Sequence, residues 1–292
     1  MMMREGDSVE VKYFLVAFLD LLGQREHLRK LKSLPKDLRP DEKTVRVLKA
    51  TLGAVHGVRS CFSDYFNVER EDSEFMRALP ADQREAVRQL TRADVVQYGF
   101  SDSFIVAVSL KDADGDAAPI NGVWSALFAS CSVAIVSLAC HHALRGGIDA
   151  GLGVQISQSE VYGPALERAY TLEEKFAEYP RILIGAELLV YLDTVASATP
   201  GTPGQSYAVI QAQSAKRLIF TDADGRLALD FLGPEFRSLA PAATAGVVGR
   251  AYEFVRTERE RMVAMGNTKL TDRYDRLVAY FRLRGPLWGL RE

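Results

Sequence analysis

The pattern of apolar and polar residues predicts alternating strands and helices along the first two thirds of the chain. Residues 11–20 are rich in aromatic and β-branched side chains, which predicts a buried strand. Residues 42–66 carry apolar side chains at three- and four-residue spacing, which predicts a long amphipathic helix. Residues 95–110 form two apolar runs joined through residues 101–103 and therefore predict a pair of adjacent strands.

A long uncharged run follows these two strands. No charged residue occurs between Asn121 and Cys140, and a segment of that length could span a bilayer. Serines interrupt the run, so we expect a buried helix capped by Asn121 rather than a membrane span. Beyond it, residues 145–155 predict a strand, residues 163–179 a helix that begins with proline, and residues 181–185 a short buried strand.

This order of elements indicates an α+β fold. Two adjacent strands with helical crossovers on either side predict a ferredoxin-like split βαβ sheet over residues 11–186. Residues 187–292 are expected to form a C-terminal extension packed on the same domain. The extension should contain a hairpin around Asp224 and Gly225 and a terminal amphipathic helix over residues 271–284.

Composition and charge narrow the class of protein. With 292 residues, of which 48% are hydrophobic and 25% charged, the chain can build a sizeable core. A formal net charge of -2 provides no general basic field that would hold a nucleic acid. The three cysteines form no paired framework, and the N-terminus lacks the apolar segment of a signal peptide. We therefore expect a cytoplasmic protein with neither a nucleic-acid nor a membrane partner.

Two aspartates lie where apolar strands meet turns. Asp20 ends the first strand, and Asp102 lies in the tight link between the next two. An aspartate at a strand end is more often a turn or cap residue. Two such carboxylates brought together would instead suit hard divalent cations. As a pair they predict a two-metal site, with the carbonyl of Leu21 as a further ligand and free amides near Gly23 for phosphates.

Four segments match the motifs of one family when they are taken as a set. They are Phe18–Gly23 (FLDLLG), Phe100–Ser109 (FSDSFIVAVS), Arg145–Gly151 (RGGIDAG) and Tyr162–Glu173 (YGPALERAYTLE), with Tyr179-Pro180-Arg181-Ile182 beyond them. In order, they resemble the metal motif, the second metal-binding hairpin, the glycine-rich strand and the following helix of class III nucleotidyl cyclases. The match covers residues 13–185 and is most similar to the pyrimidine cyclases of bacterial Pycsar antiphage systems.

The resemblance implies a reaction and an assembly. It implies a homodimer with sites at the subunit interface and two Mn²⁺ or Mg²⁺ ions per site, held by Asp20, Asp102 and the carbonyl of Leu21. The substrate would be a ribonucleoside triphosphate, converted to its 3′,5′-cyclic monophosphate and pyrophosphate. The cyclic product would act as a second messenger on a separate effector in antiphage defence.

The chain departs from the family at the residues that stabilise the transition state. Ordinary class III cyclases carry an Asn and an Arg one turn apart on the helix after the glycine-rich strand. Glu167 and Thr171 occupy those positions here. Arg145 and Arg168 are therefore candidates for stabilising phosphate charge, although Arg168 could equally be a solvated residue of a helix face.

A second departure concerns the base. The purine-selecting Lys and Asp of the family fall at Tyr98 and Glu160, which favours a smaller pocket and a pyrimidine, with UTP preferred to CTP. A Tyr on a strand is otherwise often a core residue, and Glu160 could otherwise be an exposed loop carboxylate.

The alternative functions are a degenerate cyclase fold that binds nucleotide without turnover, a purine nucleotide cyclase, and a sensor or scaffold that never binds metal.

Overall fold

The computed structural model describes residues 11–29, 31, 39, 41–66, 74–81, 83–85, 87, 95–110, 120–157 and 160–290. The turn predicted at residues 111–116 and most of the charged segment between residues 69 and 94 lie outside these residues.

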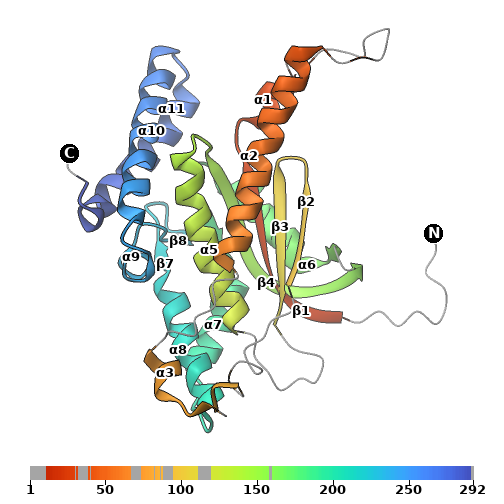
Figure 1. Ribbon diagram of the computed structural model, residues 1–292, viewed down its shortest axis with the longest axis vertical. Coiled ribbons are helices and arrows are strands. Elements are labelled where there is room, and N and C mark those ends of the chain that lie inside the picture. The colour runs from red at the N-terminus through yellow and green to blue at the C-terminus, as the bar shows by residue number, and fades with distance from the viewer. Residues whose placement is uncertain are drawn as a thin grey trace, which may run out of the picture.

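An open, mixed sheet of eight strands organises the described chain (Figure 1). The strands are β1 (Val11–Leu21), β2 (Val95–Phe100), β3 (Ser103–Ser109), β4 (Leu144–Ser157), β5 (Glu160–Tyr162), β6 (Ile182–Ile184), β7 (Ile219–Thr221) and β8 (Leu227–Leu229). Their order is β2-β3-β1-β4-β6-β8-β7, and β5 pairs with β4. The pairing of β4 with β6 is parallel and every other pairing is antiparallel. The predicted mixed α+β class is confirmed.

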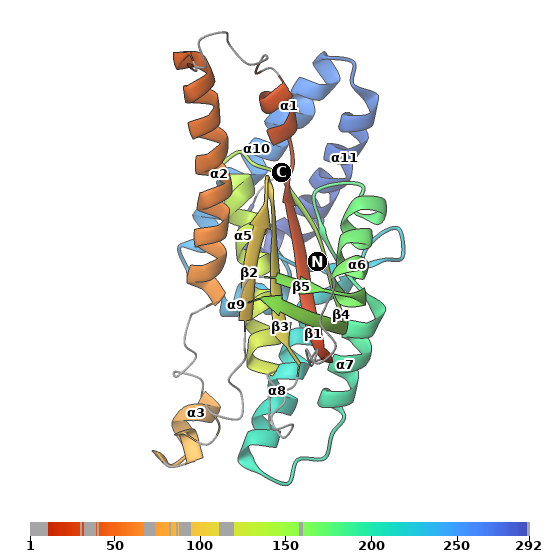
Figure 2. The same cartoon turned by 90° about the vertical axis from the view of Figure 1, so that its right-hand side faces the viewer.

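Helices cover both faces of this sheet. They are α1 (Gln24–Arg29), α2 (Glu42–Phe66), α3 (Glu74–Ala78), α5 (Ile120–Ala139), α6 (Pro164–Thr171), α7 (Ala186–Ala196), α8 (Pro203–Arg217), α9 (Pro234–Leu239), α10 (Thr244–Ala264) and α11 (Thr268–Arg284). A π-helical turn, Leu172–Phe176, continues α6, and a 3₁₀ turn, Gly285–Trp288, follows α11. In Figure 2, α2 and α5 lie on one side of the sheet and α6 on the other.

The two faces of β1 bury different clusters because successive strand residues point to opposite sides. Leu15 and Leu19 join the large core formed with α2 and α5. Phe14 and Val16 join a smaller cluster under α6, together with Ala165 of that helix. Asp20 follows the same alternation and therefore belongs to the face covered by α6, at the end of the strand.

Helix α5 is a core helix, as predicted. It is the one described helix long and apolar enough to cross a membrane, and 89% of its most apolar window is buried inside the protein. The buried hydroxyls of Ser130 and Ser132 donate to carbonyls one turn earlier, at 2.7 and 3.0 Å, which satisfies these polar groups inside the core. The predicted cap is wrong, because the helix begins at Ile120 and Asn121 is already helical.

The other predicted elements agree with the structure except at one helix end. Helix α2 has the predicted bounds, and the two adjacent strands and the hairpin at Asp224 and Gly225 are present. Helix α6 gives way to the π-helical turn after Thr171 and does not continue regularly to Tyr179. The division of the chain at residue 186 stays a prediction. Across that boundary, Leu183 of β6 pairs with Ala228 of β8.

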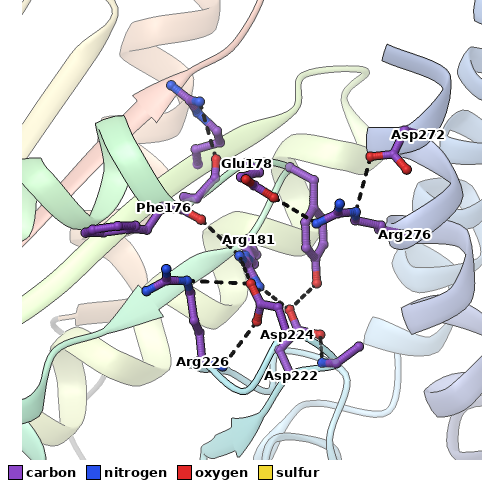
Figure 3. Close-up of polar contacts among 12 residues, drawn as sticks. Phe176, Glu178, Arg181, Asp222, Asp224, Arg226, Asp272 and Arg276 are labelled. Carbon is purple, nitrogen blue, oxygen red and sulfur yellow. Dashed lines mark hydrogen bonds and ion pairs between the residues drawn. The ribbon is translucent and has the colours of Figure 1, made fainter. Parts of the chain in front are cut away.

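A buried arginine fastens the C-terminal hairpin to the sheet (Figure 3). Arg181 is 3% exposed and contacts Asp222 at 2.5 Å and Asp224 at 2.6 Å. It also donates to the carbonyl of Phe176 at 2.9 Å. A hydrogen bond from Arg181 is the largest cause that lowers the pKa of Asp224. The lowered pKa means that this carboxylate stabilises the fold above its ordinary pKa and loses that contribution as the pH falls.

Replacing Arg181 with methionine should therefore destabilise the protein by about 3–5 kcal/mol, because it removes the buried cation that pairs with two carboxylates, of which that of Asp222 is only 10% exposed. The variant should also lose less stability between pH 7 and pH 4 than the wild type. Urea unfolding at both pH values measures this. Arg226→Met is the matched control, since Arg226 is exposed and 3.7 Å from Asp224, and it should cost less than about 1 kcal/mol. Equal losses in the two variants would contradict this role of Arg181.

Candidate functional site

Asp20 lies in the middle of the sheet with polar neighbours on both sides. In the strand register it stands between Ser103 of β3 and Arg145 of β4. The residue is only 7% exposed, and its Oδ1 accepts a hydrogen bond of 2.6 Å from Ser103 Oγ. The carboxylate is thus fixed at the end of a central strand, where a stiff backbone holds it in place.

Asp102 is held beside it by the β2–β3 turn. The backbone amide of Leu21 donates to the carbonyl of Asp102 at 3.2 Å, and Asp102 is 5% exposed. Arg59 of α2 donates to the carbonyls of Ser101 and Ser103, at 3.4 and 3.0 Å, on either side of Asp102. Ser101 has a φ of 55°, a left-handed conformation that is uncommon for a residue other than glycine. The structure therefore brings the two predicted aspartates to one end of the sheet.

A buried ion pair borders the two aspartates. Arg145 contacts the carboxylate of Glu173, which the π-helical turn presents, and also donates to the carbonyl of Ala177 at 3.3 Å. Burial raises the pKa of Glu173, the charge of Arg145 opposes this, and the charge of Asp20 raises it further. Arg145 therefore lies opposite Asp20 while its charge is engaged by Glu173.

These residues fit a divalent cation. In the described part of the chain, no three His, Cys, Asp or Glu side chains gather into a metal-binding group. Asp20 and Asp102 instead offer two nearly buried carboxylates at the end of the sheet, next to the backbone of Leu21. Such oxygen donors suit Mg²⁺ and Mn²⁺, which keep part of their coordination for water or substrate phosphates.

An apolar groove of about 610 Å³ lies on the same face of the sheet as Asp20. Phe18, two residues before Asp20, forms its floor with Ile105, and α6 contributes Leu166 and Tyr170. The rings of Phe18 and Tyr170 meet edge to face at 5.3 Å. Rings in this arrangement can hold another flat ring against them. The packing of Tyr170 against Phe18 could not be predicted from the sequence pattern alone.

Tyr98 and Glu160 lie together at the far side of this face. Tyr98 of β2 pairs with Ile105 of β3, which in turn pairs with Phe18 of β1. The hydroxyl of Tyr98 donates to the carbonyl of Val161 at 3.0 Å. Burial is the main cause that raises the pKa of Tyr98, and the charge of Glu160 adds to it. Tyr98 is not among the residues that line the groove. Its predicted role at the base stays a prediction.

Arg168 is not close to Asp20 within one chain. Its Nη1 donates to the carbonyl of Ala150 at 3.0 Å. Ala150 lies five residues along β4 from Arg145, the residue that pairs with Asp20, a separation of about 17 Å at the rise of a strand. On the opposite edge of α6, Thr171 donates to Glu167 at 3.0 Å, so these two residues form a local pair.

Gly23 has the conformation that the sequence motif requires. Its φ of 89° is left-handed, and a side chain at this position would meet no atom of the other described residues within 4 Å. The turn is anchored by the amide of Leu22, which donates to the carbonyl of Ala143 at 2.9 Å. As far as the described residues go, the backbone at Gly23 is open to a ligand next to the end of β1.

Three residues of the site are identified by the structure rather than by the sequence. Ser103 and Glu173 occur within the matched motifs, but only the fold shows that they border Asp20. Arg59 lies 44 residues before Ser103 and has no local signal. The one sequence signal that could have identified Arg59 is a charged residue at a position on the apolar face of α2, next to Val58.

Comparison with known proteins adds no further assignment. None of the protein-family models matches this chain, and none of the curated proteins matches its sequence.

The paired carboxylates predict a stabilisation by Mn²⁺ that requires both aspartates. Mn²⁺ at about 100 times its dissociation constant should stabilise the fold by about 2.7 kcal/mol and raise the melting temperature by about 5 °C. Asp20→Ala and Asp102→Ala should each abolish this shift while remaining folded. Asp193→Ala is the control, because Asp193 is a surface residue of α7 paired with Lys216, and it should shift like the wild type. A full shift in either site variant would contradict the metal site.

Proposed function

We propose that this protein is a nucleotidyl cyclase of the class III type, which converts a pyrimidine ribonucleoside triphosphate to its 3′,5′-cyclic monophosphate and pyrophosphate. UTP is the favoured substrate and CTP the next. The observation that carries the proposal is the position of Asp20 and Asp102, two nearly buried aspartates whose backbone segments meet at one end of the sheet. They come from the two segments that resemble the metal-binding motifs of this family.

The strand order supports the same proposal. Strands β4, β1, β3 and β2 are neighbours in that order, and each adjacent pair is antiparallel. Helices lie between β1 and β2 and between β3 and β4 in the sequence. This order is the one expected of a ferredoxin-like split βαβ sheet, and it supports our proposal that residues 11–186 form such a catalytic core.

Each residue of the site has a defined task in this reaction. When bound, Mn²⁺ or Mg²⁺ neutralises charge on the phosphates and favours ionisation of the ribose 3′-hydroxyl. Asp20, Asp102 and the carbonyl of Leu21 would hold the two ions. The 3′-oxygen bonds to the α-phosphorus while the bond to the β-phosphate oxygen breaks and pyrophosphate leaves. Arg145, one strand away from Asp20, neutralises the charge that develops on the phosphates.

The apolar groove beside Asp20 is suited to the base and ribose. Its walls are mainly side chains of Phe18, Ile105, Leu166 and Tyr170, with Glu167 also in the lining, so the faces of an aromatic base would pack on the rings. Tyr98 and Glu160 lie at the far side of the same face, outside the lining of the groove. Exclusion of the larger purine is the basis of the proposed pyrimidine preference.

A second copy of the chain completes the site in this proposal. Arg168 is about 17 Å from Asp20 along the sheet, too far to reach a phosphate bound there. The same face carries exposed apolar residues, among them Tyr162, which is 70% exposed beside the groove. Exposed apolar surface of this kind marks interaction sites. A homodimer would cover it and place the partner's helix α6 over the groove.

The biological setting follows from the resemblance alone. We propose a cytoplasmic enzyme whose cyclic nucleotide acts as a second messenger on a separate effector during antiphage defence. The second candidate is a protein of the same fold that binds nucleotide without turnover. The hydrogen bond between Thr171 and Glu167 favours this candidate, because neither residue can replace an Asn–Arg pair in stabilising the transition state.

Incubation of the protein with Mn²⁺ and each of the four ribonucleoside triphosphates tests the reaction. We expect a cyclic pyrimidine nucleotide and pyrophosphate in equal amounts, with UTP turned over fastest and ATP and GTP at least about tenfold more slowly. Asp20→Ala and Asp102→Ala should abolish turnover, and Asp193→Ala should retain it. Nucleotide binding without any product would favour the second candidate, and equal turnover of ATP and UTP would contradict the base preference.

Mixtures of inactive variants test whether the site is shared between chains. Asp20→Ala mixed with Arg168→Ala should recover part of the activity, because a heterodimer retains one site with all of its residues. Asp20→Ala mixed with Asp102→Ala is the control and should recover none, since both residues belong to the same half of the site. Equal lack of recovery in both mixtures, after subunit exchange is verified, would show that each site is built within one chain.

A further inference from the structure

A second cavity in the described chain lies outside the groove. It has a volume of about 690 Å³ and opens between the turn at Leu22–Gln24 and one face of helices α10 and α11. In Figures 1 and 2, α1, which follows this turn, stands at the same end of the molecule as α10 and α11. The cavity therefore begins at the backbone of Gly23, next to the end of β1.

The helical wall of this cavity carries arginines. Arg250 and Arg261 of α10 and Arg273 of α11 line it, along with Glu253 and Glu258. Arg261 is paired with Glu258 at 2.6 Å. In the part of the chain that the structure describes, neither Arg250 nor Arg273 makes a hydrogen bond or an ion pair. Two guanidinium groups are thus available to a ligand. Among the described residues that line the cavity, Glu253 is the one carboxylate that makes no ion pair, and its negative charge counts against an anion there.

Contacts of helix α11 hold Arg273 close to Arg145 and the proposed metal site. Three residues further along α11, Arg276 contacts Glu178 at 2.9 Å and Asp272 at 3.2 Å (Figure 3). Glu178 belongs to the segment directly after the π-helical turn that presents Glu173 to Arg145. Burial lowers the pKa of the half-buried Arg273 and the nearby charge of Arg145 lowers it further, while the carboxylates of Glu178 and Asp272 oppose both effects. Two cations that repel one another in this way would both be stabilised by a shared anion.

We infer that this cavity binds the phosphate chain of the nucleoside triphosphate and of the pyrophosphate product, with Arg273 as its principal cation. The inference rests on the proposed function. The planar guanidinium group suits phosphate oxygens, and backbone groups at the Gly23 turn face the same space. Arg273 comes from the C-terminal extension and thereby provides a positive charge that the matched helix lacks at Glu167 and Thr171. Arg250 contributes a second, more exposed charge.

Titration of inorganic tripolyphosphate into the full-length protein in EDTA tests this site without base, ribose or metal. Arg273→Gln should weaken binding at least about tenfold, and Arg273→Lys should weaken it less, because the lysine keeps the charge and loses the planar fork. Arg282→Gln is the matched control, since Arg282 is exposed on α11 and does not line the cavity. It should bind like the wild type. Circular dichroism verifies that every variant is folded.

The same variants in the cyclase assay separate this inference from the proposed function. Arg273→Gln should raise the KM for the triphosphate and weaken inhibition by pyrophosphate at least about tenfold. Loss of tripolyphosphate binding in Arg273→Gln without any cyclic product from the wild type would support the anion site and contradict the cyclase. Cyclic product from the wild type, with unchanged tripolyphosphate binding and KM in Arg273→Gln, would support the cyclase and overturn the anion site.

Discussion

Burial of two carboxylates at one end of the sheet is the constraint on which the rest of the structure depends. Removing a charge from water costs several kcal/mol unless partners compensate for it. Ser103 donates to Asp20, and Arg59 holds the carbonyls on both sides of Asp102. Arg145, which faces Asp20 from β4, shares its charge with Glu173. The proposed divalent cation would compensate the two aspartates further, and the proposed chemistry depends on it.

The C-terminal extension contributes directly to this end of the molecule. Strand β8 pairs with β6, and Arg181 fastens the β7–β8 hairpin to the segment that follows the π-helical turn. Helix α11 reaches the same segment through Arg276 and Glu178. The turn that presents Glu173 to Arg145 is therefore held from two sides by residues beyond position 186. These residues are needed for the geometry of the proposed site as well as for the fold.

The sequence predicts what is encoded locally and fails where distant segments meet. Asp20 and Asp102 could be selected because the strand-to-turn junctions on either side of them are visible in the pattern. Helix α2 has the bounds predicted from its apolar spacing, whereas the predicted end of α6 is wrong, because the π-helical turn has no distinct signal. The position of Arg168, about 17 Å from Asp20, depends on the register of β4. Arg273 meets the Gly23 turn only through tertiary packing, since more than two hundred residues of chain separate the two.

A crystal of the protein with Mn²⁺ and a non-cyclisable UTP analogue tests the central claim most directly, by anomalous diffraction at the manganese edge. We expect two manganese peaks about 3.5–4 Å apart, both within coordination distance of Asp20 and Asp102. We also expect the uracil ring in the groove formed by Phe18 and Tyr170. Manganese bound elsewhere, or an analogue bound with no metal at these two aspartates, would contradict the two-metal site.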